Sequence, residues 1–541
     1  MEELNEGQKS VCNSTSKHVL VIAGPGTGKT YSIAKRIESL VKQGVEPSSI
    51  ISITFTNRAA LELKERIKSS IGESYKEIFI GTIHKLGLRI IKDFTGREID
   101  VIDREGQLSL LKEILKDERK AKFELKRIQK KKNQMLFQET DHIYEEYQKR
   151  LKERELYDYE DLILRPPEIL WKIHWKTKIK HIIVDEFQDL NPAQYVFISE
   201  LAKIHSSSIC AVGDADQSIY GFRGSDVRIF LFFEKDHPDC DILRLTENYR
   251  STRAIIEAST SLIKNNKNRL ENPLVARRDG GPLIKVITVS HPWAAGDFIV
   301  EEIENKMGGL SSLSALRTDS KNAKKDLSFS DFAVIYRTHE DAAFLKGSFE
   351  SSGIPYQIIG GRFSKEGAVL REFLSEIKML LLKSGYREEN PVHARQFLHK
   401  YPFIKEKYPA LSELIQEIYY DIPIHEALPD LYLLTPSDDY NPKSDTVTLT
   451  TIHRVKGLEF SCVFIVGLDD GSIPMNRKKD FDIEEERRLL YVGMTRAKDE
   501  LFLIHSQNKR ESPFLREIPP YLIERIVKVK TKKPKKVGLF D

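Results

Sequence analysis

The sequence predicts an α/β protein with two tandem parallel sheets and a helical insertion in each half. Two observations support this prediction. Short apolar runs alternate with helix-patterned stretches, an order that is typical of parallel strands covered by helices. The chain also has 541 residues, which is more than one hydrophobic core normally serves, so we expect several domains.

The first half of the chain carries the alternating pattern most clearly. We expect strands at His18–Ala23, Ile50–Phe55, His181–Asp185 and Ser208–Val212, with helices at Thr30–Lys42 and Arg58–Ser69. The last two strands are nearly continuous apolar runs, as in parallel strands that are buried on both faces. Residues 87–154 instead have a long Lys/Glu-rich helical pattern with few strand signals, which indicates a helical insertion into the first sheet domain.

A second sheet is predicted in the other half. We expect its strands at Asp241–Leu245, Ile284–Val289, Phe332–Tyr336, Thr446–Thr450 and Cys462–Val466. The Ser/Gly/Lys-rich segment Gly308–Asp326 predicts a loop, and the helix-patterned segment Ser375–Lys443 predicts a second inserted module. The resulting boundaries are 1–86 and 155–236 for the first core, 87–154 for its insertion, 237–372 and 444–515 for the second core, 373–443 for its insertion, and 516–541 for a basic tail.

The net charge is only +4, so any nucleic-acid surface has to come from local clusters of charge. Two such clusters exist. Between Lys112 and Lys132 there are ten Lys/Arg residues against four Asp/Glu, and between Arg525 and Asp541 there are seven against one. Both clusters are open to two interpretations: a surface that binds DNA phosphates, or a solvated helix face and a solubility tail.

The cysteines and the apolar runs argue against a metal-cluster protein, a membrane protein and a secreted protein. The four cysteines, at positions 12, 210, 240 and 462, form no Cys-x-x-Cys pair that could begin a zinc or iron–sulfur site, and we expect buried, reduced thiols. No apolar run is long enough to span a bilayer, and the charged start has no signal-peptide core. We therefore expect a cytoplasmic enzyme without a membrane partner.

A glycine-rich loop between the first strand and the first helix predicts a phosphate site. The loop consists of Ala23, Gly24, Pro25, Gly26, Thr27, Gly28, Lys29 and Thr30. Its glycines let backbone N–H groups surround phosphates, Lys29 can reach the β- and γ-phosphate oxygens, and the Thr30 hydroxyl can hold Mg²⁺. Alone, the loop predicts hydrolysis of ATP or GTP.

Two adjacent carboxylates complete the predicted hydrolytic site. Asp185 and Glu186 follow an apolar strand, which places them at the carboxyl edge of a parallel sheet, where nucleotide folds keep their phosphate loop. We expect Asp185 to complete the Mg²⁺ shell. Glu186 is the candidate general base that activates the attacking water.

Further motifs resemble those of one helicase family. They are Val184–Asp189 (VDEFQD), Val212–Gly224 (VGDADQSIYGFRG), Glu247–Thr252 (ENYRST), His453–Phe460 (HRVKGLEF) and the segment Glu484–Lys498, with supporting matches at Leu4–Gln8, Thr54–Ala60, Gly81–His84 and Asp158–Leu162. In their order along the chain they resemble the motifs of UvrD/PcrA/Rep-like helicases, superfamily 1A. The resemblance implies two RecA-like phosphate-loop cores with shortened accessory insertions, called 1B and 2B.

The resemblance also implies roles around the nucleotide, which would be ATP. Gln217 matches the residue that senses the γ-phosphate, and Arg250 and Arg496 match two arginines that reach that phosphate from the second core. Gln8 matches the glutamine that reads adenine, Tyr249 an aromatic that packs on it, and Glu459 a ribose or phosphate contact. The residue after Thr30 is usually arginine in this class but is Tyr31 here, which makes adenine selectivity less secure than hydrolysis.

The implied DNA track combines aromatic faces with polar or cationic groups and binds single-stranded DNA without sequence preference. Its members are Phe55, Asn57, Thr82, His84, Tyr220, Phe222, Arg223 and His453. Phe222 stands where the family commonly has tryptophan. An ordinary core role is the alternative for each aromatic, and His84 and His453 could be buried structural histidines.

The function implied is an ATP-dependent helicase or translocase that moves 3′→5′ on single-stranded or tailed duplex DNA. The alternative is a DNA-stimulated ATPase subunit that works with a nuclease or another repair or defence protein, as in Gabija antiviral systems, because both insertions are short. The end of the tail, with Leu539 and Phe540, faintly resembles peptides that bind sliding clamps. The pathway and the oligomeric state do not follow from the sequence.

Overall fold

The structure is a computed structural model of the whole chain. It describes residues 4–97, 99–137, 141–172, 178–308, 327–359, 367–384, 392–419, 422–424, 427–428, 431, 440–476 and 481–528. The chain divides into two compact units, each described here by itself. The first unit comprises residues 1–24, 28–246 and 360–439, and the second comprises 25–27, 247–359 and 440–541.

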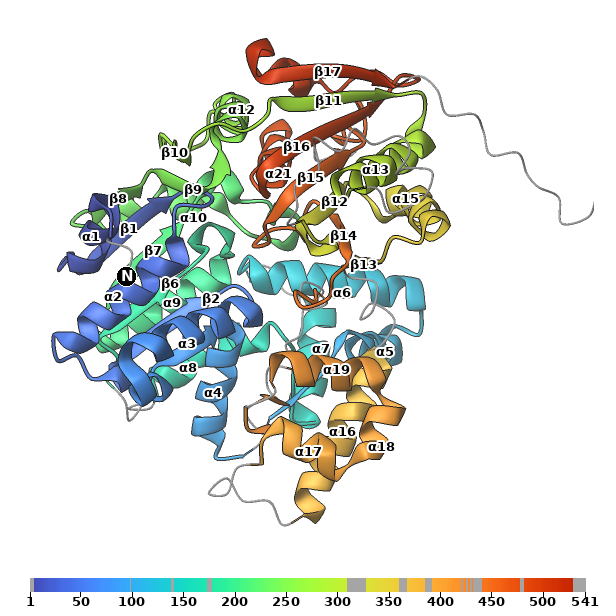
Figure 1. Cartoon of the computed structure of the whole chain (residues 1–541). Coiled ribbons are helices and arrows are strands. Elements are labelled where there is room, and N and C mark those ends of the chain that lie inside the picture. The colour runs from blue at the N-terminus through green and yellow to red at the C-terminus, as the bar shows by residue number, and fades with distance from the viewer. Residues whose placement is uncertain are drawn as a thin grey trace, which may run out of the picture. The chain divides into compact units, whose positions relative to one another are not determined.

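The first unit is built on a six-stranded parallel sheet with the order β3-β2-β6-β7-β1-β8 (Figure 1). The strands are β1 (His18–Ala23), β2 (Ile50–Thr54), β3 (Phe79–Thr82), β6 (His181–Val184), β7 (Ser208–Gly213) and β8 (Asp241–Leu245). They alternate with α1 (Glu6–Asn13), α2 (Lys29–Lys42), α3 (Asn57–Ile71) and α9 (Pro192–His205). Apolar side chains of β1, β2, α2 and α3 form one buried core, so the predicted α/β fold class is confirmed.

The last strand of this sheet corrects the sequence analysis. Asp241–Leu245 was expected to begin the second sheet, but it pairs in parallel with β1, with Val19 opposite Asp241 and Ala23 opposite Leu245. The apolar pattern of a short segment predicts a strand, but it does not indicate which sheet the strand joins. That expectation was wrong, and the first sheet runs to Leu245.

The described residues between 87 and 154 are mainly helical, as predicted. They include most of α4 (Ile83–Thr95) and all of α5 (Arg104–Leu115), α6 (Glu118–Asn133) and α7 (His142–Glu153), with the two-residue strand β4 (Asp100–Val101) pairing β5 (Leu156–Tyr157). Leu110, Leu125, Ile128, Tyr147 and Leu151 are buried together in the core of these helices. The chain returns to the sheet through α8 (Asp161–Leu170).

The helical segment near residue 400 belongs to the first unit by its contacts. Its helices are α16 (Gly367–Lys383), α17 (Ala394–Lys400), α18 (Pro402–Lys407) and α19 (Pro409–Ile418), which share a buried apolar core. Lys378 on α16 lies 3.6 Å from the carboxylate of Asp100. The segment predicted as an insertion into the second core is therefore helical, and it contacts the first insertion.

The second unit contains a seven-stranded parallel sheet with the order β13-β14-β12-β15-β16-β11-β17 (Figure 1). Its strands are β11 (Ile284–Val289), β12 (Phe332–Tyr336), β13 (Tyr356–Ile358), β14 (Val447–Thr451), β15 (Phe460–Val466), β16 (Ala497–Ser506) and β17 (Ile523–Lys528). Its helices include α12 (Arg253–Ile263), α13 (Pro292–Lys306), α15 (His339–Ser352) and α21 (Ile483–Met494), and β9 (Glu247–Thr252) pairs with β10 (Val275–Arg278). The remaining four predicted strands are thus confirmed.

One glycine sets the distance between two helices of the first unit. A Cβ atom on Gly87 of α4 would stand 1.7 Å from the backbone oxygen of Leu162 in α8. We expect Gly87→Ala to destabilise the protein by about 1–3 kcal/mol, because the added methyl group overpacks a backbone contact. Gly347→Ala is the matched control: Gly347 lies inside α15 with no atom within 4 Å of its would-be Cβ, so its free energy of unfolding should stay equal or rise. Urea unfolding of both variants checks this, and equal values would contradict it.

Candidate functional site

The glycine-rich loop leaves β1 and enters α2, which begins at Lys29. Gly26 and Gly28 have positive φ angles of +66° and +82°, which explains glycine at both positions. The loop therefore has the strand–loop–helix context in which backbone N–H groups and a helix N-terminus bind phosphate. The side chain of Thr27 is buried, whereas Lys29 and Thr30 are partly accessible.

Lys29 faces a carboxylate from another strand of the sheet. Its Nζ donates to the backbone oxygen of Ala23 at 3.2 Å and lies 3.8 Å from Oε1 of Glu186. Glu186 follows β6 and has a left-handed backbone, with φ +50° and ψ +41°. This conformation is uncommon for residues other than glycine and is concentrated at functional sites. The structure thus brings the predicted Lys29 and Glu186 together.

Two residues without an assigned role in the sequence analysis hold this site in place. Gln188 donates from Nε2 to Oε2 of Glu186 at 2.5 Å, and its Oε1 accepts from the backbone N–H of Asp214 at 3.0 Å. Asp214 Oδ2 in turn accepts from Nε2 of Gln217 at 2.7 Å. Gln188, Asp214 and Gln217 are all buried. The signal for them was their position inside motifs already identified: Gln188 lies four residues after the end of β6, and Asp214 directly follows β7.

Asp214 has an unusual electrostatic environment. Burial raises the pKa of its carboxyl group above the usual range, although the charge of Lys29 and the hydrogen bond from Gln217 act in the opposite direction. Charge on Asp214 is therefore sensitive to the position of Lys29. Because β6, β7 and β1 are neighbours in the sheet, Glu186, Asp214 and the phosphate loop meet at one carboxyl edge.

The predicted Mg²⁺ ligands have suitable chemistry. Asp185 is largely buried directly after β6, where its Oδ1 accepts from the N–H of Glu186 at 2.9 Å. Thr30 lies in the first turn of α2. Mg²⁺ prefers a few hard oxygen ligands and completes its shell with phosphate and water, so one carboxylate and one hydroxyl fit this ion. The described residues contain no cluster of three or more His, Cys, Asp or Glu side chains suited to a metal.

Gln8 lies against the phosphate loop. Its Nε2 is 2.9 Å from the point where a Cβ on Gly28 would stand, and its Oε1 accepts from the N–H of Asn5 at 3.2 Å in a capping box of α1. The cap fixes the orientation of the side chain beside the loop. The place suits the predicted contact with a nucleotide base, which remains a prediction.

The second unit brings its predicted nucleotide residues together. Arg250 donates from Nε to Glu459 at 2.7 Å and from Nη1 to the backbone oxygen of Thr495 at 3.3 Å, next to the buried Arg496. Burial alone would raise the pKa of Glu459, but Arg250 and Lys498 hold it at about 2. Glu459 is therefore an anion that engages an arginine, a contact that the expected ribose or phosphate role did not include.

The predicted aromatic residue of this group is accessible. Tyr249 is 47% exposed, and its hydroxyl group donates to Glu247 at 2.6 Å. About half of the side chain is thus accessible while its hydroxyl group is anchored. Arg496 is instead held internally, from Nε to the oxygen of Val492 at 3.0 Å.

Four members of the predicted DNA track form one aromatic cluster in the first unit. The rings of Phe55 and Tyr220 stack with centroids 5.2 Å apart, and the guanidinium of Arg223 lies 5.3 Å from Tyr220 and 5.6 Å from Phe222. Tyr220 is buried, whereas Phe222 is 61% exposed. Phe222 is therefore accessible to solvent, with the cation of Arg223 beside its ring.

The polar members of the track have more local roles. Thr82 caps the N-terminus of α4, accepting from the N–H of Lys85 at 3.3 Å, and Asn57 is buried in the first turn of α3. His84 stacks on Tyr159 at 3.8 Å, and burial lowers its pKa to about 3. This low pKa favours the neutral form of the imidazole. His453 belongs to the second unit, 3.4 Å from Nη1 of Arg337.

The basic run 112–132 is not one continuous charged face. Lys132 is fully buried, 2.5 Å from Asp158 and 2.8 Å from Asp161, and Lys131 is paired with Asp141 at 3.1 Å. Burial alone would lower the pKa of Lys132, but the two aspartates raise it above its usual value. Treating all ten cations as one solvated or DNA-binding face was therefore wrong, because the last two hold the helix to the core.

Glu160 in this buried cluster predicts a pH dependence of stability. Burial, reinforced by the charge of Asp158, raises its pKa to about 8. The folded state therefore keeps a proton on Glu160 that the unfolded state loses near pH 4.3. The contribution of this proton to the free energy of unfolding is complete below about pH 4.3 and is lost as the pH rises towards 8. We expect Glu160→Gln to have a higher free energy of unfolding than the unmodified protein at pH 8.5 and a similar one at pH 5. The same difference at both pH values would contradict this.

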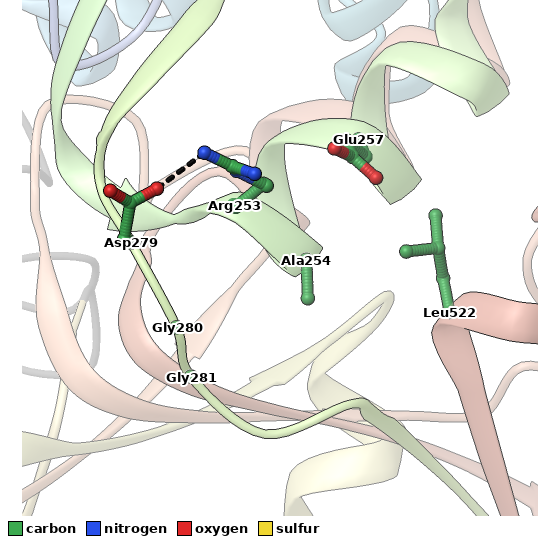
Figure 2. A pocket seen from close by; sticks show the side chains of 7 residues that line it. All are labelled: Arg253, Ala254, Glu257, Asp279, Gly280, Gly281 and Leu522. Carbon is green, nitrogen blue, oxygen red and sulfur yellow. Dashed lines mark hydrogen bonds and ion pairs between the residues drawn. The ribbon is translucent and has the colours of Figure 1, made fainter.

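A separate hollow in the second unit has a volume of about 470 Å³. Figure 2 shows the ion pair between Arg253 and Asp279 at its side. No residue of the predicted nucleotide or DNA sites contributes to it. It is lined by Arg253, Ala254, Glu257, Asp279, Gly280, Gly281 and Leu522.

The cysteines, the helices and the C-terminal segment bear on the remaining predictions. All four cysteines are free; Cys12, Cys210 and Cys462 are buried as predicted, but Cys240 is only half-buried. Within the described residues, every helix is too short or too polar to cross a membrane. The basic tail was predicted to begin at residue 516, but Ile523–Lys528 forms β17 and pairs in parallel with β11. That boundary was wrong, because the pairing partner lies more than 200 residues earlier in the chain. Residues 529–541 and the predicted loop 308–326, apart from its first residue, lie outside the described residues.

Together, a phosphate loop, its lysine and a left-handed glutamate at one edge of a parallel sheet define a phosphate-loop enzyme that hydrolyses a nucleotide. The sequence matches the UvrD/REP helicase N-terminal domain over residues 4–238 and the UvrD-like helicase C-terminal domain over residues 243–366 and 393–508. The chain belongs to the UvrD/REP helicase family.

Similar proteins cover nearly the whole chain. It is 29% identical to the ATP-dependent DNA helicase PcrA of Bacillus subtilis (strain 168), over 97% of this chain and 86% of that protein. The identity is 28% to the proteins of the same name from Staphylococcus aureus (strain Mu50) and Staphylococcus epidermidis (strain RP62A), over 97% of this chain and 87% of each. These relatives do not favour the alternative of an ATPase subunit that depends on a nuclease partner.

Proposed function

We propose that this UvrD/REP helicase hydrolyses ATP at the edge of its first sheet and uses that reaction to move 3′→5′ along single-stranded DNA. The observation that carries the proposal is the connected set Lys29, Glu186, Gln188, Asp214 and Gln217. The proposed class of this chain, an ATP-dependent DNA helicase, agrees with the family of the chain and with the names of its relatives. Residues 87–154 and 373–443 are accessory modules in this proposal.

In the proposed reaction, the loop N–H groups and Lys29 bind the β- and γ-phosphates of ATP. Glu186 accepts a proton from the attacking water, and Gln188 holds the carboxylate in position through its bond to Oε2. Thr30 and Asp185 would hold Mg²⁺, which neutralises phosphate charge and orients the leaving group. Gln217, anchored on Asp214, would sense the γ-phosphate and pass a change there to the track loop that follows it in sequence.

The second unit contributes the remaining charge in this proposal. Arg250 and Arg496 would reach the γ-phosphate when the two units close on ATP, and Gln8 and Tyr249 would bind the adenine. Arginines of this kind contribute on the order of 10³–10⁵ in rate. Glu459, which engages Arg250 at 2.7 Å, would hold that side chain ready between cycles. Hydrolysis of ATP then depends on closure of the two units. This dependence is the basis of directed movement in the proposal.

The proposed DNA track binds bases by stacking and phosphates by polar contacts. Phe222 offers an exposed ring, Arg223 adds a cation next to it, and Phe55 stacks on Tyr220. Stacking on aromatic rings tolerates any base, so binding should be independent of sequence. His453 would provide the corresponding contact from the second unit.

One series of assays tests this function. ATP hydrolysis is measured without nucleic acid, with single-stranded DNA and with single-stranded RNA of the same sequence, and unwinding is measured on duplexes with a 3′ or a 5′ tail. We expect DNA to stimulate hydrolysis and only the 3′-tailed duplex to be unwound. Unwinding of only the 5′-tailed duplex would refute the polarity, and hydrolysis that ignores DNA would refute the motor.

A further inference from the structure

The exposed face of α6 carries a line of cations around one aromatic ring. Arg119, Phe123, Lys126 and Lys130 follow one another at spacings of four, three and four residues. At about 100° per residue, they lie within about 60° of one another around the helix axis, over a length of about 16 Å. We call these four residues the α6 stripe. The buried residues of the helix, Ala121, Leu125, Ile128, Lys131 and Lys132, lie on the other side.

The stripe differs from most of the other charged residues nearby. Lys120 is the exception on α6, since it is exposed and, among the described residues, no side-chain hydrogen bond or ion pair reaches it, but it lies about 100° from Arg119 around the helix. Lys112 and Lys122 are both paired with Glu118, and Arg127 with Glu124 and Asp141. By contrast, within the described part of the chain, no hydrogen bond or ion pair reaches the side chains of Arg119, Lys126 and Lys130, which are all exposed. Three cations without counter-charges in one line create a local field that attracts a polyanion.

The aromatic residue identifies the kind of polyanion. Phe123 is 67% exposed in the middle of the stripe. A duplex hides the faces of its bases and could use only the cations, whereas a single strand offers both phosphates and unstacked bases. Cations that alternate with an open ring therefore fit single-stranded nucleic acid better than a duplex.

The stripe also leads to the proposed DNA track. Asn133, three residues beyond Lys130, lies on the same face of α6, and its Cβ is 3.6 Å from the point where a Cβ on Gly224 would stand. Its Oδ1 accepts from Asn191 at 3.1 Å. Gly224 directly follows Phe222 and Arg223, which are both exposed. The C-terminal end of the stripe thus adjoins the exposed end of the track within one unit.

We propose that the α6 stripe is a second contact for single-stranded DNA, which extends the track beyond Phe222 and Arg223. Arg119, Lys126 and Lys130 bind phosphates, and Phe123 stacks on a base. This inference rests on the proposed function, because the track itself is part of that proposal. It adds a surface outside the sheet core, on the helical insertion, and predicts that a longer strand binds more tightly than the track alone allows.

The test compares binding of oligodeoxythymidines of about 8 and about 25 nucleotides, measured by fluorescence anisotropy over a range of salt concentrations. For the triple variant R119Q/K126Q/K130Q we expect the slope of log K against log salt to decrease by about 2 on the long oligonucleotide, at about 0.7 per lost phosphate contact. Phe123→Ala should weaken binding of the long oligonucleotide about fivefold or more. Both variants should bind the short one like the unmodified protein, with an unchanged kcat at saturating DNA.

The matched control is K149Q/R150Q/R154Q, which removes three charges from the end of the same insertion where each cation is paired with a glutamate. Its salt slope should not change. Stripe variants that bind both lengths normally, or lose both equally, would overturn the inference, as would a larger loss on a blunt duplex of about 25 base pairs. If the unmodified protein neither binds these strands nor hydrolyses ATP faster with them, the proposed function fails as well.

Discussion

Glu186→Gln should lower the kcat of DNA-stimulated ATP hydrolysis by about 10²–10⁴, the usual contribution of a positioned general base. The amide cannot accept the proton of the attacking water, but it keeps the shape of the side chain and its place near Lys29 and Gln188. Nucleotide affinity should therefore change little. Lys29→Ala should instead abolish hydrolysis and weaken nucleotide binding, because that ammonium contacts the phosphates directly in the proposed site.

Single-turnover hydrolysis and nucleotide titration separate these two effects. Glu38→Gln is the matched control: Glu38 is a carboxylate paired with Lys35 and Lys42 on α2, the helix that follows the phosphate loop. Its kcat should equal that of the unmodified protein. If Glu186→Gln keeps more than a tenth of the activity, Glu186 is not the base, and if Lys29→Ala still hydrolyses ATP on DNA, the site is wrong.

Lys132→Met should destabilise the protein by about 3–5 kcal/mol at neutral pH, because it leaves Asp158 and Asp161 buried without their shared cation. Both carboxylates lie within hydrogen-bonding distance of the ammonium, and Asp158 also accepts from the hydroxyl group of Tyr147 at 3.1 Å. Burial already raises the pKa of Asp158 to about 6, and removal of Lys132 raises it further. The loss should therefore shrink as the pH falls and the carboxyl groups take up protons.

Urea unfolding at pH 5 and pH 8 measures this loss. Lys122→Met is the control, since the exposed ion pair of Lys122 with Glu118 should be worth less than about 1 kcal/mol. Adding Asp158→Asn and Asp161→Asn to Lys132→Met should recover part of the stability, because the unpaired charge is gone. A loss below 1 kcal/mol for Lys132→Met, or no recovery in the triple variant, would show that the cluster is not held by charge.

Much of the fold could be predicted because its signals are local. The phosphate loop and the buried parallel strands, such as His181–Val184, are each contained in a few consecutive residues. Asp241–Leu245 was misassigned because the pairing of a strand depends on a partner more than 200 residues away, at Val19–Ala23. Burial of Lys132 likewise depends on Asp158 and Asp161, 26 and 29 residues further on, and a run of lysines carries no sign of it.

The candidate site was predictable in its motifs and less so in its internal connections. Lys29 and Glu186 were paired by the topological rule that strand ends meet at one edge. The left-handed backbone of Glu186 and the hydrogen bonds of Gln188 to Glu186 and to the N–H of Asp214 arise only after three strands are side by side. Asp214 went unassigned for that reason, although it lies three residues before Gln217.

The position of β8 has a practical meaning for anyone who divides this chain into fragments. A fragment cut at Asp236, the boundary that the sequence predicts, would lose the strand that pairs with β1 from Val19 to Ala23. β1 would then become an open sheet edge made of apolar residues, and such an edge is a template for aggregation. A fragment that extends to Thr246 keeps this edge covered by β8, whose Arg244 is exposed.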